Sequence, residues 1–453
     1  MSRFLNLSSI LLLALTISPS AEPLPDAQRL MGTVETLASP AFQGRLLGSP
    51  GGLSAQEWLR DEAAASGLLP LAGWDVPVQT FQVRGYRWMN LKAALRGPRE
   101  MEFELILKSD GPLPRHRGAL KHWDDTDAAP LCAAHEVLFR DFNPGAGESP
   151  SDLLDEAARA GAGALILLPH PDDERGLFAR YRMRSESGDL AVHYLPGSEA
   201  RPILFYGSLE LREALAQNLE GWHLELPEVE AFSTQGDNLL YRLPESQAGS
   251  IVLLVAHYDH LGPAEGGYHP GANDNGSGVA VLLETARLLA QRQYPFELRF
   301  LFSDGEEEVM LGARAYLAEM EDPELVINLD TVGRAGVNHY RHLRDPSALD
   351  PELLMLWSED DSAAAEALES LASNLEFHVE RGHGPIFERA GDHFPFAQAG
   401  VPALFIFGGF HAGYHQPQDT ADLVLPDKLV KLCELLRDFL DSKAKVQLEN
   451  QNR

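Results

Sequence analysis

Long apolar runs alternate with a strongly helical segment in the second half of the chain. The runs SIVLLVAH, LRFLFSD, LVINLD and VPALFIFG are almost wholly apolar, and residues 278–291 carry apolar side chains at helical spacing. Strands that are buried on both faces and connected by helices are typical of parallel sheets. The pattern therefore predicts a three-layer α/β sandwich around a mixed, mostly parallel sheet over residues 238–445.

The first half of the chain predicts two further segments. Apolar residues recur at helical spacing after residue 26, and Ser54 and Gly67 are placed to begin and end a second helix. Short alternating runs follow, so residues 26–108 are expected to be the N-terminal part of the same domain. Between residues 110 and 235, apolar strands and an Ala-rich helix indicate a separate, smaller α/β domain.

The first 21 residues have the pattern of an export signal. A basic start at Arg3 is followed by the apolar run ILLLALTI and by small residues up to Ala21. This run has the length of a signal peptide and is too short for a stable membrane span. We therefore expect cleavage near Ala21, a periplasmic or secreted protein, and no membrane span elsewhere.

The composition excludes other classes of protein. A net charge of −30 repels phosphate backbones, so nucleic-acid binding is not expected, and most of the charge is expected to form a solubilising surface. Cys132 and Cys433 form no metal or redox motif. A disulfide between them and two buried free thiols are both open. No pattern indicates an oligomeric state.

Side chains that bind metals follow four of the apolar runs. His257 ends the first run, an acidic cluster at residues 304–308 follows the second, Asp330 ends the third, and residues 411–415 contain two histidines after the fourth. In open α/β sheets, ligands collect beyond the carboxyl ends of the strands. We therefore expect these side chains to converge at one edge of the sheet, together with Asp274 from a glycine-rich loop.

A pair of zinc ions requires a mixed set of histidines and carboxylates, with one bridging carboxylate and about two further ligands for each ion. Taken singly, each motif has a simpler interpretation as a turn acid, a helix cap or an ordinary strand-end histidine. Asp259 lies two residues from His257, so its side chain is expected to orient the imidazole. The candidate ligands are His257, Asp274, Glu307, Asp330 and His415.

The chain resembles metallopeptidase family twenty-eight, the co-catalytic enzymes of the aminopeptidase Y type, in six strings that occur in fixed order. They are HYDHLG, GANDNGSG, DGEE with MLGA, INLDTVGR, GDHFPF and YHQPQDT. The segment FQGRLLGSPGG resembles the lead-in of that family, and residues 110–235 resemble a protease-associated domain. The resemblance covers nearly the whole chain and implies an aminopeptidase for peptide substrates, with two zinc ions per chain, a metal-bridged hydroxide and a glutamate general base. Together with the export signal, it predicts an exported enzyme.

The resemblance also implies which side chains hold each ion. His257 and Asp330 would hold one zinc ion. Glu307 and His415 would hold the other, and Asp274 would bridge the two. All five positions carry the expected residue type, so an inactive relative is disfavoured.

The catalytic roles follow from the same resemblance. Glu306 would be the general base, and the hydroxyl of Tyr414 would hydrogen-bond the developing oxyanion. Because three glutamates are consecutive, a register shifted by one would make Glu307 the base and Glu308 the ligand. Val309 departs from the family, which commonly has glycine there, and this difference is expected to alter the turn after the glutamates.

Three other functions remain open at this point. A carboxypeptidase on the same scaffold would need basic residues for the substrate carboxylate, and Arg334, Arg341 and Arg389 are available. A glutaminyl-cyclase-like enzyme would need only one zinc ion, and a non-catalytic binding protein would use the region 110–235. Asp392 and His393 belong to a recurrent segment, with support of the site and contact with substrate both open.

Overall fold

The computed structural model of the chain describes most of the residues between 23 and 451. The described ranges are 23–88, 93–96, 102–108, 120–123, 129, 132, 136–142, 150–170, 191–195, 203–218, 222–225, 229–247, 249–264, 266–338, 346–358, 363–382, 387 and 390–451. The expected export signal lies outside these ranges, as do Arg341 and Arg389.

The larger sheet has ten strands in the order β18-β17-β19-β16-β12-β15-β11-β2-β8, and β1 pairs with β11. These strands are β1 (Leu69–Pro70), β2 (Val78–Trp88), β8 (Ala191–Tyr194), β11 (Val229–Arg242), β12 (Ile251–His257), β15 (Glu297–Ser303), β16 (Leu325–Asp330), β17 (Leu353–Ser358), β18 (His378–Arg381) and β19 (Ala403–Phe407). The central strands β15, β12, β16 and β19 are parallel, and the outer strands are mixed. The predicted fold class, a mixed sheet with a parallel centre, is confirmed.

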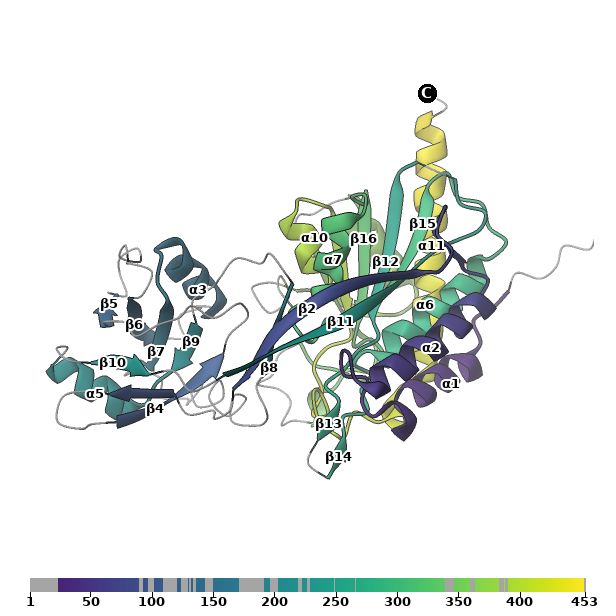
Figure 1. The fold of residues 1–453 in the computed structure, drawn as a ribbon. Helices are drawn as coiled ribbons and strands as arrows, with labels where there is room; N and C mark the ends of the chain where they lie inside the picture. Colours follow the sequence, from purple (N-terminus) through teal and green to yellow (C-terminus); the bar gives the residue numbers. More distant parts are fainter. Residues whose placement is uncertain are drawn as a thin grey trace, which may run out of the picture.

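Helices cover both faces of this sheet (Figure 1). One face carries α1 (Ala27–Leu37), α2 (Pro50–Ala65), α6 (Gly276–Leu289), α8 (Ala363–Asn374) and α11 (Pro426–Gln451), and the other carries α7 (Leu311–Glu319) and α10 (His393–Gln398). Alternate residues of β12 show why the strand sequence is continuously apolar. Val252 and Leu254 pack into one core, whereas Leu253 and Val255 pack into the other.

A smaller sheet has the strand order β10-β3-β4-β9-β7-β6-β5. Its elements are β3 (Ala93–Arg96), β4 (Glu102–Lys108), β5 (Leu120–His122), β6 (Val137–Phe142), α3 (Pro150–Arg159), β7 (Ala164–Pro169), β9 (Ile203–Tyr206), α5 (Leu209–Gln217) and β10 (His223–Glu225). The expected boundary between residues 108 and 110 therefore falls between strands that belong to one sheet. The long antiparallel pair β2 and β11 leads from the larger sheet toward this smaller one (Figure 1).

The remaining elements are short. They are the 3-10 turns η1 (Pro40–Phe42), η5 (Pro346–Ala348) and η6 (Ala421–Leu423) and the hairpin of β13 (Pro263–Ala264) and β14 (Gly267–Tyr268).

The start of α2 differs from the sequence prediction, which placed the cap at Ser54. Ser49 caps the helix instead, since its hydroxyl accepts from the backbone N–H of Gly52 at 3.1 Å. Pro50 suits the first helical position, where its missing N–H has no cost. Gly51 is required in the first turn because a Cβ there would lie 2.0 Å from the carbonyl oxygen of Phe42. Gly51 and Gly52 therefore lie in the first turn of the helix.

Both cysteines are free. Cys433 is fully buried in α11 and packs into the main core, where burial raises the pKa of its thiol. Cys132 is partly buried in the region of the smaller sheet. Of the two possibilities left by the sequence, the structure has free thiols.

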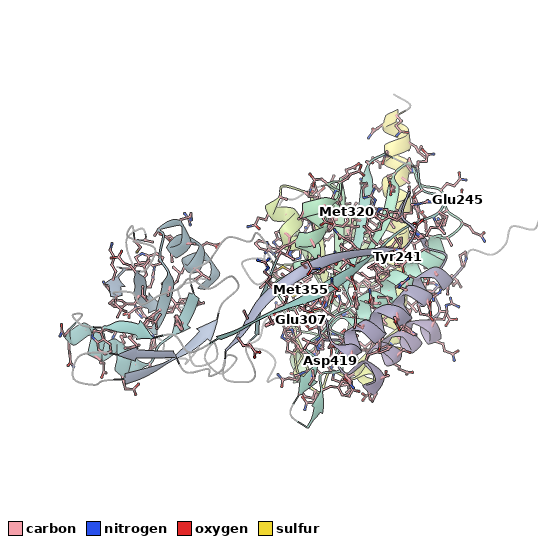
Figure 2. All side chains as sticks on the ribbon, viewed as in Figure 1. Tyr241, Glu245, Glu307, Met320, Met355 and Asp419 are labelled. Atoms are coloured by element: carbon pink, nitrogen blue, oxygen red, sulfur yellow. The ribbon has the colours of Figure 1, made fainter. Side chains whose placement is uncertain are left out.

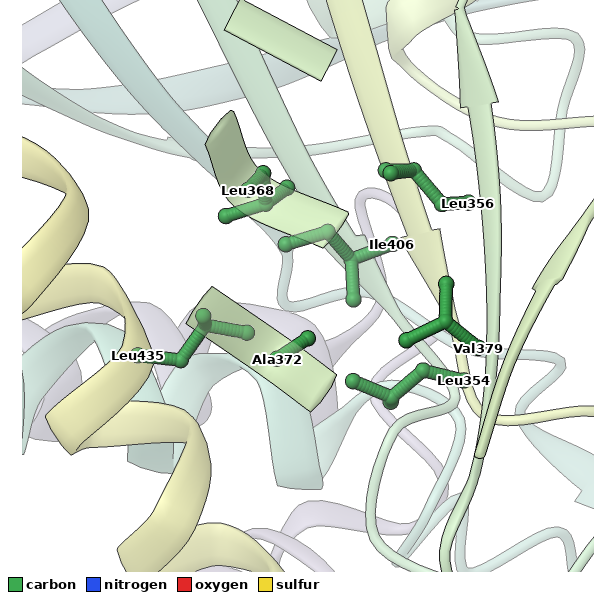
Figure 3. Close-up of a pocket in the computed structure, with 7 residues that line it drawn as sticks. All are labelled: Leu354, Leu356, Leu368, Ala372, Val379, Ile406 and Leu435. Carbon is green, nitrogen blue, oxygen red and sulfur yellow. The ribbon is translucent and has the colours of Figure 1, made fainter. Parts of the chain in front are cut away.

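A small gap in the core lies between α8, α11 and the strands β17 to β19 (Figure 3). Leu354, Leu368 and Leu435 are among its seven lining residues, all of which are aliphatic. A dry aliphatic gap offers no group that can move a proton or hold an ion.

Candidate metal centre

The parallel centre of the larger sheet brings its strand ends to one edge. His257 at the end of β12 lies opposite Ser303 at the end of β15, and Asp330 at the end of β16 lies opposite Phe407 at the end of β19. The loops that follow these strands extend from the same edge. This register explains how side chains that are far apart in sequence reach one site.

The first cluster surrounds the imidazole of His257. Its Nε2 lies 3.4 Å from Oδ1 of Asp274 and 3.6 Å from Oδ1 of Asp330. Oε2 of Glu306 lies slightly farther away, at 3.9 Å. His257, Asp274 and Asp330 are buried and are positioned to hold one metal ion.

The second cluster uses the other oxygen of the same aspartate. Nε2 of His415 lies 3.2 Å from Oδ2 of Asp274 and 3.2 Å from Oε2 of Glu307. Glu307 also contacts His260, whose Nδ1 lies 2.6 Å from Oε1. The side chain of His415 is 36% exposed, so this cluster is the one that faces solvent.

The two clusters fit divalent ions by their spacing and by their unsatisfied atoms. Two ligands at zinc bond lengths in a tetrahedron are separated by about 3.3 Å. The separations of His257 from Asp274 and Asp330 are 3.4 and 3.6 Å, and those of His415 from Asp274 and Glu307 are both 3.2 Å, close to that value. Within the described part of the chain, the buried atoms Nε2 of His257 and Oδ2 of Asp274 have no hydrogen-bond partner. Buried polar atoms are normally paired, so these two orphaned atoms fit the role of metal ligands.

Glu306 and Glu307 are adjacent but differ in proton affinity. Burial raises the pKa of Glu306 well above its usual value, and the neighbouring Asp330 adds to this effect. Burial also acts to raise the pKa of Glu307, but His415 and His260 outweigh it and lower that pKa to about 2. Glu306 is therefore suited to take up a proton, whereas Glu307 is suited to remain an anionic ligand.

Asp259 accepts hydrogen bonds from the backbone of both Glu306 and Glu307. Its carboxylate accepts from the N–H of Glu306 at 3.1 Å and from that of Glu307 at 3.4 Å. The Nδ1 atom of His257 lies 3.2 Å from the carbonyl oxygen of Asp259 and 3.6 Å from its Oδ1. Asp259 therefore connects the first histidine to the turn that carries the glutamates.

Residues 238–440 match the model of peptidase family M28. The chain carries a peptidase family M28 domain. Aminopeptidase YwaD of Bacillus subtilis (strain 168) is 30% identical over 198 residues, which cover 41% of this chain and 39% of YwaD. The probable lipoprotein aminopeptidase LpqL of Mycobacterium tuberculosis (strain ATCC 25618 / H37Rv) is 24% identical over 447 residues, which cover 86% of this chain and 79% of LpqL. The predicted family is thereby confirmed.

Two curated relatives extend well beyond the matched region. The chain spans 39% of YwaD and 65% of the uncharacterized protein YfbL of Escherichia coli (strain K12). Among solved structures, the aminopeptidase from Aneurinibacillus sp. strain AM-1 has a TM-score of 0.62 at 21% identity, covering 93% of this chain and 94% of that one. BSAP, a zinc aminopeptidase from Bacillus subtilis, has a TM-score of 0.53 at 20% identity, covering 92% and 95%. These likenesses establish the fold.

In the M28 domain, Asp419 ties the loop of Asp274 to the loop of His415. Its Oδ2 accepts from the backbone N–H groups of Asn273 and Asp274, both at 3.0 Å, and its Oδ1 lies 3.3 Å from Nη1 of Arg334. The side chain is fully buried. Figure 2 labels Asp419 and Glu307, which both lie in the M28 domain. Asp419 belongs to the YHQPQDT motif. Its partners are backbone N–H groups, which a sequence motif does not identify.

We expect Asp419→Ala to weaken metal binding about 10- to 100-fold, because groups that orient metal ligands usually have effects of that size. Removing the carboxylate would leave two buried backbone N–H groups without an acceptor and would loosen the loop that carries Asp274. Zinc titration of the metal-free protein measures this change. Asp422→Ala, at an exposed carboxylate three residues away, is the matched control. Equal zinc affinity in the two variants would contradict the role of Asp419.

Arg45 is a second residue that the sequence analysis did not select. Its guanidinium is fully buried and donates to the carbonyl oxygens of Leu37, Tyr258, Pro270 and Gly271 at 2.6 to 2.9 Å. Arg45 therefore connects the end of α1 to the segment that follows His257 and to the loop that precedes Asp274. The segment FQGRLLGSPGG was the only signal for it, since every close acceptor is a backbone group.

The turn after the glutamates contains the expected departure from the family. Val309 has a φ of 66° and Met310 a φ of 57°. This left-handed region favours glycine, and it is unusual for a β-branched side chain. The turn is closed by hydrogen bonds from the N–H of Met310 to the carbonyl oxygen of Glu306 and from that of Leu311 to Gly305. The common glycine at position 309 is explained by this conformation.

Tyr414, Asp392 and His393 lie in three different surroundings. The ring of Tyr414 stacks on His415, with centroids 4.1 Å apart and planes at 14°. Asp392 is buried and accepts a hydrogen bond from the Ser303 hydroxyl, and burial raises the pKa of Asp392 to about 7. His393 stacks on Phe405 at 4.2 Å in the core. Asp392 therefore contacts the end of β15 beside the site, whereas the ring of His393 packs in the core beneath it.

Proposed function

We propose that this chain is an exported aminopeptidase that uses two zinc ions to remove single residues from the amino end of peptides. The observation that carries the proposal is the position of Asp274, whose two carboxylate oxygens face different histidines. Oδ1 lies 3.4 Å from His257 and Oδ2 lies 3.2 Å from His415. One carboxylate between two ligand clusters is the arrangement that a pair of co-catalytic ions requires.

Five residues are the proposed metal ligands. His257 and Asp330 would hold the first ion, His415 and Glu307 the second, and Asp274 both. When bound, such a pair of ions increases the acidity of water and polarises the scissile carbonyl.

Glu306 is the proposed general base. Its Oε2 atom lies beside the first cluster, 3.9 Å from Nε2 of His257. In the proposed reaction Oε2 takes a proton from the attacking water and later gives it to the nitrogen of the leaving amine. The hydroxyl of Tyr414, whose ring lies on His415, donates to the oxygen of the scissile carbonyl as negative charge develops there.

Of the three arginines that a carboxypeptidase could use, Arg334 is the one within the described residues, and its surroundings do not suit that role. That activity needs a guanidinium that is available for the substrate carboxylate. Arg334 is instead paired with the buried Asp419 at 3.3 Å and also donates to the carbonyl oxygen of Gln418. The names of YwaD and LpqL, both aminopeptidases, support the same preference.

Export is proposed from the sequence of the first 21 residues. The name of LpqL, a probable lipoprotein aminopeptidase, is compatible with a location outside the cytoplasm. Among the described residues, no helix combines the length and apolarity needed to cross a membrane. We further propose that the smaller sheet belongs to a protease-associated-like domain beside the M28 domain.

The purified chain tests the proposal in three measurements. Elemental analysis is expected to give about two zinc ions per chain, and a panel of aminoacyl-nitroanilides is expected to be hydrolysed, whereas N-blocked peptides with free C-termini are not. Chelation is expected to abolish turnover, and zinc to restore it. Turnover of the N-blocked substrates alone would favour a carboxypeptidase. Neither zinc nor turnover in folded protein would favour a binding protein.

A further inference from the structure

His260 is a buried histidine beside the second cluster that belongs to neither proposed ligand set. It follows β12 by three residues, and its side chain is fully buried. Its Nδ1 atom lies 2.6 Å from Oε1 of Glu307, while the other oxygen of Glu307, Oε2, lies 3.2 Å from Nε2 of His415. The two oxygens of Glu307 thus have different partners.

His260, Asp274 and Glu307 together form a group that could hold a metal ion. The 2.6 Å contact between Nδ1 of His260 and Oε1 of Glu307 is nevertheless that of a hydrogen bond and not of two ligands on one ion. Ligands of a tetrahedral zinc ion lie about 3.3 Å apart, which is well beyond 2.6 Å. A charge-assisted hydrogen bond to a carboxylate does have such a length. Since an ionised carboxylate only accepts, Nδ1 of His260 carries the proton and donates it to Glu307.

The ring of His260 is held in place from several sides. Its backbone N–H donates to the carbonyl oxygen of Arg45 at 3.2 Å. The rings of His269 and His415 lie edge-on, with centroids 6.3 and 6.1 Å away. Gly271 passes so close that a Cβ there would lie 2.5 Å from Cδ2 of His260. The donor atom is therefore fixed before Glu307 meets an ion.

We propose that His260 is a positioning residue that holds Oε1 of Glu307 and thereby turns Oε2 toward the second metal ion. The proposal rests on the two-zinc function above. A carboxylate that is free to rotate loses conformational entropy when it binds a metal, and a fixed donor removes part of that cost. The affinity of the second ion should therefore depend on a hydrogen donor at the position of Nδ1.

The test compares His260→Asn with His260→Gln in the full chain. The amide nitrogen of asparagine is bonded to Cγ, as Nδ1 is, whereas that of glutamine is one bond farther from the backbone. Both replacements are polar and neither fills the volume of the ring, so a role in packing alone would affect the two variants similarly. His269→Gln is the control, because the Nδ1 of His269 lies 3.3 Å from the carbonyl oxygen of Gly262.

The readout is zinc titration of metal-free protein by calorimetry. We expect the second binding step of His260→Gln to weaken about 10- to 100-fold, with the first step unchanged. His260→Asn and His269→Gln should stay close to wild type. Repeating the series in an Asp330→Asn background, which lacks a ligand of the first cluster, assigns the affected step to the second cluster.

Three results would overturn the inference. The first is a His260→Gln variant that binds the second ion as tightly as wild type. The second is an equal loss of both ions in the Asn and Gln variants, together with a loss of thermal stability. The third is a wild-type protein that binds a single ion. Only this last result would also overturn the proposed function, so the two failures are distinguishable.

Discussion

Glu306→Gln is expected to lower kcat for aminoacyl-nitroanilide hydrolysis by about 10²- to 10⁴-fold, the usual contribution of a general base. The amide has nearly the same shape as the carboxylate but cannot accept the proton of the attacking water. Glu306 lies 3.9 Å from Nε2 of His257, whereas the proposed ligands Asp274 and Asp330 lie 3.4 and 3.6 Å from that atom. The substitution should therefore leave zinc binding unchanged. Steady-state kinetics together with elemental analysis of the same preparation measure both quantities.

The two neighbouring glutamates provide the comparison that fixes the register. Glu307→Gln should lose zinc from the second cluster, because Oε2 of Glu307 lies 3.2 Å from His415. Glu308→Gln should retain both zinc and turnover. If Glu306→Gln remains active while Glu307→Gln is zinc-loaded and inactive, the register shifted by one residue is correct and the base is Glu307.

The sequence predicted the parallel core of the fold because burial on both faces leaves a clear pattern. In β12 all seven residues are buried and the run is apolar up to His257, and β16 is also buried throughout although Asn328 and Asp330 are polar. Since parallel strands end at one edge, the convergence of His257, Asp330 and the loop ligands could be predicted before any distance was known. This part of the inference depends only on topology.

The supporting residues that the sequence did not reveal contact backbone groups, or contact a side chain on another loop. Arg45 donates to four carbonyl oxygens within 2.9 Å, and Asp419 accepts from two consecutive N–H groups. Such contacts have no periodicity and no spacing rule, because any residue type supplies the partner. His260 belongs to the motif HYDHLG, but only its distance from Glu307 distinguishes it from an ordinary buried histidine.

The smaller sheet shows a different reason for an incomplete prediction. Its strand β4 begins with the alternating run EFEL, and β2 contains the similar run FQVR, so local pattern alone could not assign the two strands to different sheets. Pairing decides the assignment. β2 pairs with β11 in the larger sheet, whereas β4 pairs with β9 in the smaller one.

Asp274→Asn is expected to reduce zinc binding from two ions to one or none and to abolish nearly all turnover. Asparagine preserves the volume of the side chain but has one oxygen and one amide NH₂ group, which is not a zinc ligand. It can therefore serve one cluster only. The backbone N–H of residue 274 would still donate to Asp419, so the loop itself should keep its conformation.

The thermal response to zinc separates this effect from misfolding. A ligand that binds only the native state at 100 times its Kd stabilises the protein by about 2.7 kcal/mol, so wild-type Tm should rise with zinc. The metal-free Asp274→Asn variant should unfold near the wild-type metal-free Tm and gain little when zinc is added. Asp322→Asn makes the same chemical change at an exposed position and should respond as wild type does. A full zinc response in Asp274→Asn would show that Asp274 does not join the two clusters, and the two-zinc mechanism would then lack its bridging ligand.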